Sequence, residues 1–210
     1  MKPATQSLVA DRPEQMPDQP GYFSSETVLG ILKLILAGSE LSEVLSVIAR
    51  LVESKGNGML LCTVWLPDAS GKQLYCVAAP SLPHFAASMG RTTVGPKGAS
   101  CGTAIYRREP VYVTDIRQDP IWDDYRDRIL PFGIRAVWSR PLFTREGKIL
   151  GTFAIHYREV RTPSAVDLEL IENASHIAGI AIERHMNEEA LRHKGDLSAH
   201  ETHLFREFSR

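Results

Sequence analysis

Cys101 is the residue whose type and position could support covalent chemistry. It follows a glycine-rich turn and lies near the start of a helix predicted over residues 98–108. Unpaired backbone amides and the helix dipole at such a position stabilise a thiolate and lower the pKa of the thiol. Gly98 and Gly102 would let another molecule approach closely. Two interpretations stay open, a redox-sensing or modified thiol and an inert buried one, because free cysteine often packs as a small hydrophobe.

A second group of residues combines aromatic rings with charged side chains. Together with Cys101, the candidate ligand-binding residues are Asp115, Trp122, Tyr125, Arg135 and Trp138. Amphipathic rings beside a few charged groups form the apolar walls and polar contacts that small-molecule sites use. Each residue also has an ordinary structural explanation, since tryptophans fill cores and an aspartate can cap the turn after a strand. We predict no catalytic residue and no metal site, and the residues leave the cofactor unknown.

Helical and strand patterns alternate along the chain in the order of an α+β fold. Tight turns join antiparallel strands, and helices stand at both ends. Ser24 or Ser25 can N-cap the first helix, and Thr162 followed by Pro163 can begin the last. Helices are predicted from residue 24 with a break at 38–40, over 41–53, 81–89, 98–108 and 121–131, and from residue 162. Strands are predicted over 59–66, 73–79, 111–113, 135–143 and 148–157. Residues 91–94 are predicted to be a connector or a further strand.

The turn between the first two strands suggests a register for their side chains. If Leu66 faces Lys72 across the turn, Cys62 lies opposite Cys76. A slip of one residue would move every side chain to the other face. The expectation is therefore two core thiols without chemistry.

The last predicted helix is longer than the domain beneath it needs. Apolar and polar residues recur along it at a spacing that alternates four and three, and nothing breaks the pattern before Gly195. The residues on this spacing are Leu170, Ala174, Ile177, Ala181, Arg184, Glu188 and Leu191. This period suits a parallel coiled coil with a second copy, and fraying of the more polar second half is the alternative. We predict a homodimer.

Four sequence segments, in this order and spacing, resemble GAF domains. They are SCGTAIYRREPVYVTDI (100–116), DPIWDDY (119–125), GIRAVWSRPLF (133–143) and ILGTFAIHY (149–157). The resemblance covers residues 26–184 and implies a six-stranded antiparallel sheet with the first and last helices on one face. It implies that the helix from Gly98, the Asp115 loop and residues 122–125 roof a ligand pocket. Residues 136–139 and 152–156 should floor it.

The resemblance implies a sensory or regulatory module rather than an enzyme. GAF modules of this kind precede histidine kinases and diguanylate cyclases in bacterial signalling, so a two-component or cyclase output partner is expected, with an unidentified small molecule as ligand. The predicted division is a disordered leader over 1–23, a GAF domain over 24–184, and a helical continuation with a flexible tail over 185–210.

Other members of the family suggest alternatives. SCGTA resembles the segment of free methionine-(R)-sulfoxide reductase, which would make Cys101 part of a thiol enzyme, but the further cysteine expected near Ala136 is missing. No Cys-His pair suggests a bilin, and no cyclic-nucleotide signature is found. Haem would need one axial ligand from His84, His156 or His176. A degenerate domain that serves only as a dimerisation scaffold is a third possibility.

Composition limits the classes of partner. The 24 basic and 25 acidic side chains give a formal net charge of −1, which disfavours nucleic acid and anionic membranes. The three cysteines form no Cys-x-x-Cys pair. The N-terminus lacks a signal-peptide pattern, and the longest apolar run is far shorter than a bilayer span. We therefore expect a cytoplasmic protein with reduced thiols.

Overall fold

A six-stranded sheet separates two sets of helices in the computed structural model, which describes residues 23–207 and the side chains of residues 23–192. The strands are β1 (Leu60–Pro67), β2 (Gln73–Ala78), β3 (Thr92–Thr93), β4 (Val111–Val113), β5 (Ala136–Phe143) and β6 (Ile149–Tyr157), in the order β3-β2-β1-β6-β5-β4. All paired strands are antiparallel. The predicted α+β class and six-stranded antiparallel sheet are confirmed.

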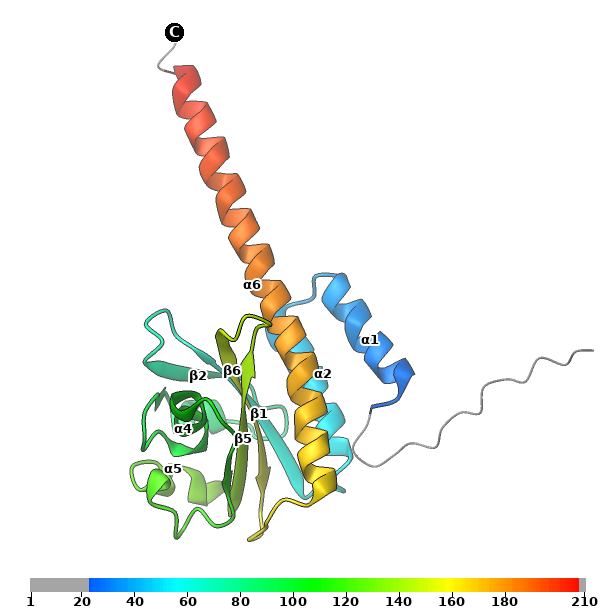
Figure 1. The fold of residues 1–210 in the computed structure, drawn as a ribbon, viewed down its shortest axis with the longest axis vertical. Helices are drawn as coiled ribbons and strands as arrows, with labels where there is room; N and C mark the ends of the chain where they lie inside the picture. Colours follow the sequence, from blue (N-terminus) through cyan, green and yellow to red (C-terminus); the bar gives the residue numbers. More distant parts are fainter. Residues whose placement is uncertain (1–22, 208–210) are drawn as a thin grey trace, which may run out of the picture.

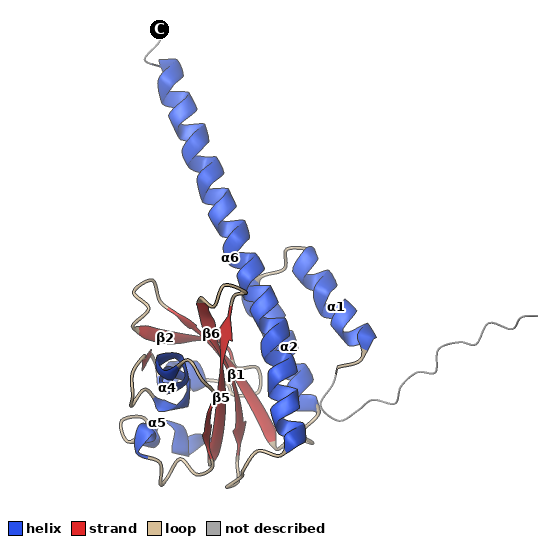
Figure 2. Cartoon of the chain, viewed as in Figure 1, coloured by secondary structure: helices blue, strands red, loops and turns tan. Residues whose placement is uncertain are grey.

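Helices α2 and α6 cover one face of the sheet, α1 packs on the outer side of α2, and the shorter helices lie against the other face (Figures 1 and 2). The first set is α1 (Ser25–Leu36), α2 (Leu41–Ser54) and α6 (Ala165–Glu207); the second is α3 (Phe85–Met89), α4 (Ala99–Arg107) and α5 (Arg126–Ile129), with 3-10 turns η1 (Pro120–Trp122) and η2 (Leu130–Phe132). Ser24 caps α1, because its side chain accepts a hydrogen bond from the Thr27 amide at 3.2 Å.

The larger apolar cluster lies between the sheet and the long helices. The buried members of this cluster on α6 are Leu170, Ile171, Ala174, Ala178, Ala181 and Ile182. Four members of the predicted coiled-coil series, Leu170, Ala174, Ile177 and Ala181, therefore pack against this domain rather than a second copy. Leu191 stays 68% exposed. The predicted seam residues that remain free of this cluster lie farther along α6.

The start of α6 differs from the prediction. The helix begins at Ala165, and Ser164 rather than Thr162 occupies the capping position. The Ser164 amide donates to Asp167 Oδ2 at 2.9 Å and the Asp167 amide donates to Ser164 Oγ at 3.3 Å, a reciprocal capping arrangement. At the other end the helix continues across Gly195 to Glu207, because one glycine weakens a helix without ending it.

The predicted register of the first hairpin is wrong. Trp65, not Cys62, pairs with Cys76, and Cys62 instead pairs with Ile155 of β6. The reason lies in the turn: the Asp68 amide bonds to the Gln73 carbonyl, and the Lys72 carbonyl accepts from Val94, so Lys72 leaves the hairpin ladder. An irregularity between residues 64 and 65 adds a further shift. The two thiols belong to clusters on opposite faces of the sheet.

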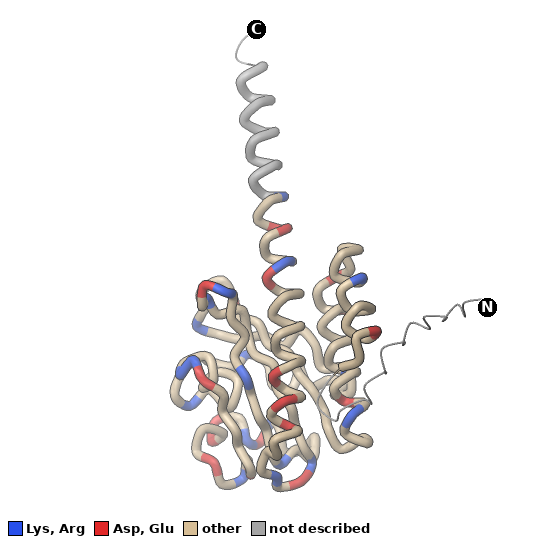
Figure 3. The backbone as a smooth tube through the Cα atoms, turned by 45° about the vertical axis from the view of Figure 1, so that its right-hand side comes forward, with Lys and Arg blue, Asp and Glu red and all other residues tan. Residues whose placement is uncertain are grey.

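The predicted leader falls almost entirely on residues 1–22, which lie outside the described residues. Across the described part of the chain, no helix has the length and apolar character needed to cross a membrane. In the view of Figure 3, basic and acidic residues are interspersed rather than gathered on one face. This distribution accords with the formal net charge of −1.

Candidate functional site

The second apolar cluster lies between the sheet and α3, α4 and α5, where the ligand pocket was predicted. Trp122 and Tyr125 are buried in this cluster, and the polar atom of each side chain forms a hydrogen bond to a neighbouring element. The Trp122 Nε1–H donates to Ser100 Oγ at 3.0 Å, and Tyr125 Oη accepts from the Thr93 amide at 3.0 Å. These two bonds tie the segment around η1 to α4 and β3, which together form a roof over the sheet.

Asp115 and Arg135 form an ion pair at the edge of this roof. The Arg135 Nη2 and Nε groups donate to the two carboxylate oxygens at 2.8 and 3.2 Å. The same carboxylate accepts from the Arg117 amide at 3.1 Å, so it also caps the turn after β4. Hydrogen bonding from Arg135 lowers the pKa of Asp115. The pair holds the roof loop to the start of β5, and each charge is compensated by the other.

Cys101 does not have the environment that its helix position suggested. Its Sγ lies 3.3 Å from Ser139 Oγ and the residue is 7% exposed. Burial raises the pKa of the thiol, and the neighbouring hydroxyls of Ser139 and Thr152 offset only part of that shift. The expected lowering of its pKa is therefore wrong, because loss of water outweighs the helix N-terminus.

Gly98 and Gly102 also have a different role from the predicted one. A Cβ on Gly98 would lie 1.9 Å from the Thr93 carbonyl oxygen, and one on Gly102 would lie 2.0 Å from the same atom. The two glycines therefore admit the chain's own β3 against α4 rather than another molecule. This close approach sets the distance between the roof helix and the sheet edge.

Trp138 lies apart from the other candidate residues. Successive side chains of a strand point to opposite faces, and its neighbour Val137 belongs to the cluster under α4. Trp138 itself packs in the cluster under the long helices, with its ring centroid 4.8 Å from that of Tyr157. The structure thus brings together Cys101, Trp122 and Tyr125, places the Asp115–Arg135 pair at their edge, and puts Trp138 behind the sheet.

A strip of buried polar side chains under α4 was not singled out from the sequence. It consists of Thr63, Thr103, Ser139, Thr152 and His156, each at most 1% exposed. Three atoms of this strip have no partner at hydrogen-bond geometry among the described residues: Thr103 Oγ1, His156 Nδ1 and Thr152 Oγ1, the last of which is still close enough to the Cys101 thiol to act on its pKa. The signal was present in the alternation of Thr152, Ala154 and His156 along β6, within the predicted pocket floor.

His156 is the most polar group of the strip. Its Nε2 lies 2.8 Å from Thr63 Oγ1, which also accepts the Trp65 Nε1–H at 2.9 Å. The hydroxyl that accepts from Trp65 can donate its own hydrogen to Nε2, and in that tautomer the ring proton lies on Nδ1. The ring meets Phe85 edge-on at 5.6 Å. Burial lowers the pKa of His156 to about 3, so the imidazole is neutral near pH 7.

The interior therefore offers uncharged hydrogen-bonding groups in an apolar setting. Of the three histidines considered for haem, only His156 lies here: His84 is exposed before α3, and His176 is exposed on α6. Within the described residues there is no group of three or more His, Cys, Asp or Glu side chains placed to hold a metal ion. These groups can donate or accept hydrogen bonds to an uncharged partner.

Comparison with known proteins agrees with this geometry. A family model described as GAF domain matches residues 38–183. A methyl sulfide methyltransferase-associated sensor from Methanosarcina acetivorans is 36% identical over 163 residues, which are 77% of this chain but 16% of that longer protein. The chain therefore spans only a small part of that curated relative.

Solved structures show the same fold at lower identity. The domain of a two-component sensor histidine kinase from Sinorhizobium meliloti aligns with a TM-score of 0.58 and 20% identity, over 73% of this chain and 98% of that one. Free methionine-R-sulfoxide reductase from Neisseria meningitidis, solved with its substrate, aligns with a TM-score of 0.59 and 18% identity, over 80% and 96% of the two chains. At these identities the likeness concerns the fold alone.

Proposed function

This chain belongs to the GAF domain family, and on that premise we propose that it is a sensory module that binds a small uncharged molecule between α4 and the sheet. The observation that carries the proposal is the set of three unpartnered polar atoms on Thr103, Thr152 and His156. A buried polar atom without a partner costs about 1–3 kcal/mol. A ligand that hydrogen-bonds to these atoms would remove that cost, so the domain should favour its bound form.

The uncharged character of the ligand follows from the groups that face the interior. His156 is neutral near pH 7, and Asp115 and Arg135 neutralise each other at the edge. A charged ligand placed beside hydroxyls and a neutral imidazole would lose its hydration without gaining a counter-charge. Because the polar strip is buried, entry requires the roof formed by β3, α4 and η1 to move.

Strand β6 provides a route from this site to α6. His156 and Tyr157 are neighbours on β6 with side chains on opposite faces. The Tyr157 hydroxyl donates to Asp167 Oδ1 at 3.0 Å, in the first turn of α6, and Arg161 lies over the Tyr157 ring at 4.5 Å. A ligand that shifts β6 would therefore change the packing of α6 at its start.

We expect Tyr157→Phe to loosen this connection. The variant keeps the ring and removes the hydroxyl, so the first turn of α6 loses about 1 kcal/mol of local stability. Hydrogen exchange measured by mass spectrometry should show faster exchange in residues 165–170 and unchanged exchange in β1. Tyr112→Phe, on the partly exposed Tyr112 of β4, is the control. Equal exchange in both variants would argue against the route.

The output of the module is proposed to be a dimer that acts on a signalling enzyme. α6 extends beyond the sheet and keeps Leu191 exposed, and α1 exposes Leu29 and Leu36 beside it. These side chains could meet their counterparts in a homodimer. A histidine kinase or a diguanylate cyclase is the proposed kind of partner, and the likeness to a sensor and to a domain of a sensor histidine kinase supports the first of these.

We also propose that the module is not an enzyme. A thiol-dependent reductase would need a reactive thiolate, whereas burial raises the pKa of Cys101. The alternative, a thiol-dependent reductase, predicts turnover of free methionine sulfoxide by the parent protein and no turnover by Cys101→Ser. We expect no turnover by the parent protein under reducing conditions.

Native mass spectrometry of the protein purified from its own host tests the sensor proposal directly. We expect a dimer that carries a stoichiometric small molecule, and comparison with the denatured mass separates non-covalent binding from attachment at Cys101. A dimer without ligand, even after incubation with host metabolite extract, would favour the scaffold alternative. A bare monomer would contradict both the sensor and the dimeric readout.

A matched pair of threonine substitutions tests the interior strip. Thr152→Val removes an unpartnered hydroxyl, so stability in urea should be unchanged or rise by about 1 kcal/mol while ligand retention falls. Thr63→Val removes a hydroxyl that joins Trp65 and His156, and should cost about 1–3 kcal/mol. If both variants lose stability equally, Thr152 does not carry the free hydrogen-bonding capacity that the proposal assigns to it.

A further inference from the structure

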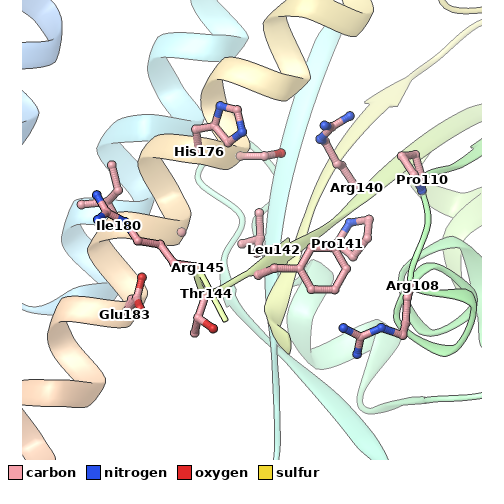
Figure 4. A pocket seen from close by; sticks show the side chains of 13 residues that line it. Arg108, Pro110, Arg140, Pro141, Leu142, Thr144, Arg145, His176, Ile180 and Glu183 are labelled. Atoms are coloured by element: carbon pink, nitrogen blue, oxygen red, sulfur yellow. The ribbon is translucent and has the colours of Figure 1, made fainter. Parts of the chain in front are cut away.

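A second groove lies outside the sheet–α4 interior, between α6 and the β5–β6 turn (Figure 4). Its volume is about 480 Å³, within the range of small-molecule sites. Leu142 and Phe143 of β5 lie across from Ile180 of α6. Phe143 and Ile180 are 36% and 52% exposed, so large apolar side chains remain open to solvent here. The groove has apolar surface that the fold has not covered.

The charged residues around the groove are mostly basic. Three arginines line it, Arg108, Arg140 and Arg145, against the single carboxylate of Glu183. Arg140 is paired with Glu172 at 2.7 Å, whereas Arg108 donates to the neutral Gly147 carbonyl and has no carboxylate partner among the described residues. In Figure 4, Arg108 lies on the opposite side of the groove from Glu183. The Arg108 side therefore suits an anion.

Two residues of the groove depart from the preference of their local structure. Arg108 ends α4 with φ 59°, a left-handed conformation in which glycine or asparagine is usual. Its guanidinium lies 5.1 Å from the Phe143 ring centroid. Gly179 lies inside α6, where glycine is less favourable than alanine. A Cβ on Gly179 would make only an ordinary contact, 3.9 Å from the Phe143 carbonyl oxygen.

Packing therefore does not require a glycine at 179, and helix geometry does not favour an arginine at 108. Both residues line the same groove. Gly179 leaves space in it, and Arg108 places a cation without a carboxylate partner among the described residues beside the Phe143 ring. Departures from local preference of this kind concentrate at functional sites. We propose that the groove binds an organic anion with an apolar body, such as a medium-chain carboxylate, with its anionic group on Arg108 and its body against the exposed side chains of Phe143 and Ile180.

This site does not depend on a ligand in the interior strip, since it uses a different face and different elements. It would nevertheless act on the same helix, because Gly179 and Ile180 belong to α6. An anion seated there would hold α6 against the β5–β6 turn. The groove would then be a second input to the helix that carries the proposed output.

Titration with the fluorescent anion anilinonaphthalene sulfonate tests the proposal on the full chain. We expect one saturable site, displaced by octanoate but not by octanol at equal concentration. Gly179→Gln should weaken binding by roughly tenfold or more, because its side chain fills the groove. Gly30→Gln is the control, since Gly30 is a mid-helix glycine of α1 with open space around it.

Arg108→Gln and Arg107→Gln test the charge separately. The two arginines are adjacent and exposed, but only Arg108 lines the groove. Binding should weaken several-fold in Arg108→Gln and remain unchanged in Arg107→Gln. Near-ultraviolet circular dichroism checks that each variant is folded. If Arg108→Gln does not fold, the binding measurement on Gly179→Gln alone tests the groove. Equal binding by Gly179→Gln and the parent protein, or equal displacement by octanol and octanoate, would overturn the proposal.

Discussion

Gly102→Ala should destabilise the domain strongly, although alanine is the better helix former. The added Cβ would lie 2.0 Å from the Thr93 carbonyl oxygen and 3.3 Å from the Thr92 side chain. The first of these neighbours is backbone, so β3 or α4 must shift. Overpacking of this kind outweighs the gain of about 1 kcal/mol in helix propensity, and we expect a net loss of roughly 2–4 kcal/mol in the free energy of unfolding.

The effect should extend to the roof over the proposed ligand site. The Thr93 amide donates to Tyr125 Oη, so displacement of β3 would also loosen the segment around η1. Urea unfolding gives the stability, and hydrogen exchange of residues 120–129 reports the roof. Gly30→Ala is the control, since open space surrounds that glycine and the substitution should stabilise by about 0.5–1 kcal/mol. Comparable stability of the two variants would mean that α4 does not rest on the Thr93 carbonyl.

The arrangement of elements could be predicted because each has a strong local signal. The strand Val111–Val113 has the predicted bounds, and the cap at Ser24 was one of the two predicted alternatives. The order of helices and strands then limits the topology. The predicted cap of α6 lies two residues before the observed one, because both Thr162 and Ser164 can cap a helix and the hydrogen bonds between Ser164 and Asp167 select Ser164.

The candidate site was less predictable because it depends on which face each side chain takes. A local pattern does not say which face of β5 lies under α4, so Trp138 was grouped with Trp122 although the sheet separates them. Cys101 was judged from its helix position, whereas its pKa is controlled by burial between α4 and the sheet. Thr152 and His156 lie in the predicted pocket floor, and His156 is also a predicted haem-ligand candidate, but their lack of hydrogen-bond partners among the described residues is visible only in the fold.

Stability should fall steeply in mild acid because of His156. The pKa of this residue is about 3 in the folded protein, below the ordinary value of 6.5 that the unfolded chain has. Below pH 6.5 the unfolded state therefore binds a proton at His156 that the folded state does not bind. His156 does not lower the free energy of unfolding above pH 6.5, and it lowers that energy progressively as pH falls from 6.5 toward 3. Between pH 7.5 and 4.5 we expect a loss of roughly 2–3 kcal/mol from this one group.

His156→Gln isolates that contribution. Glutamine does not titrate and can still hydrogen-bond Thr63 Oγ1, so its unfolding free energy should lose the part of the slope that His156 supplies. His176→Gln, at an exposed position of α6, should keep the slope of the parent protein. Asp115 and Asp167 also have lowered pKa values, but carboxylates act mainly below pH 5, so the slope between pH 5 and 7 separates the two effects. An unchanged slope in His156→Gln would mean that the imidazole takes up its proton in the folded state, and the interior could then accept an anion. The same measurement therefore tests both the burial of His156 and the uncharged character of the proposed ligand.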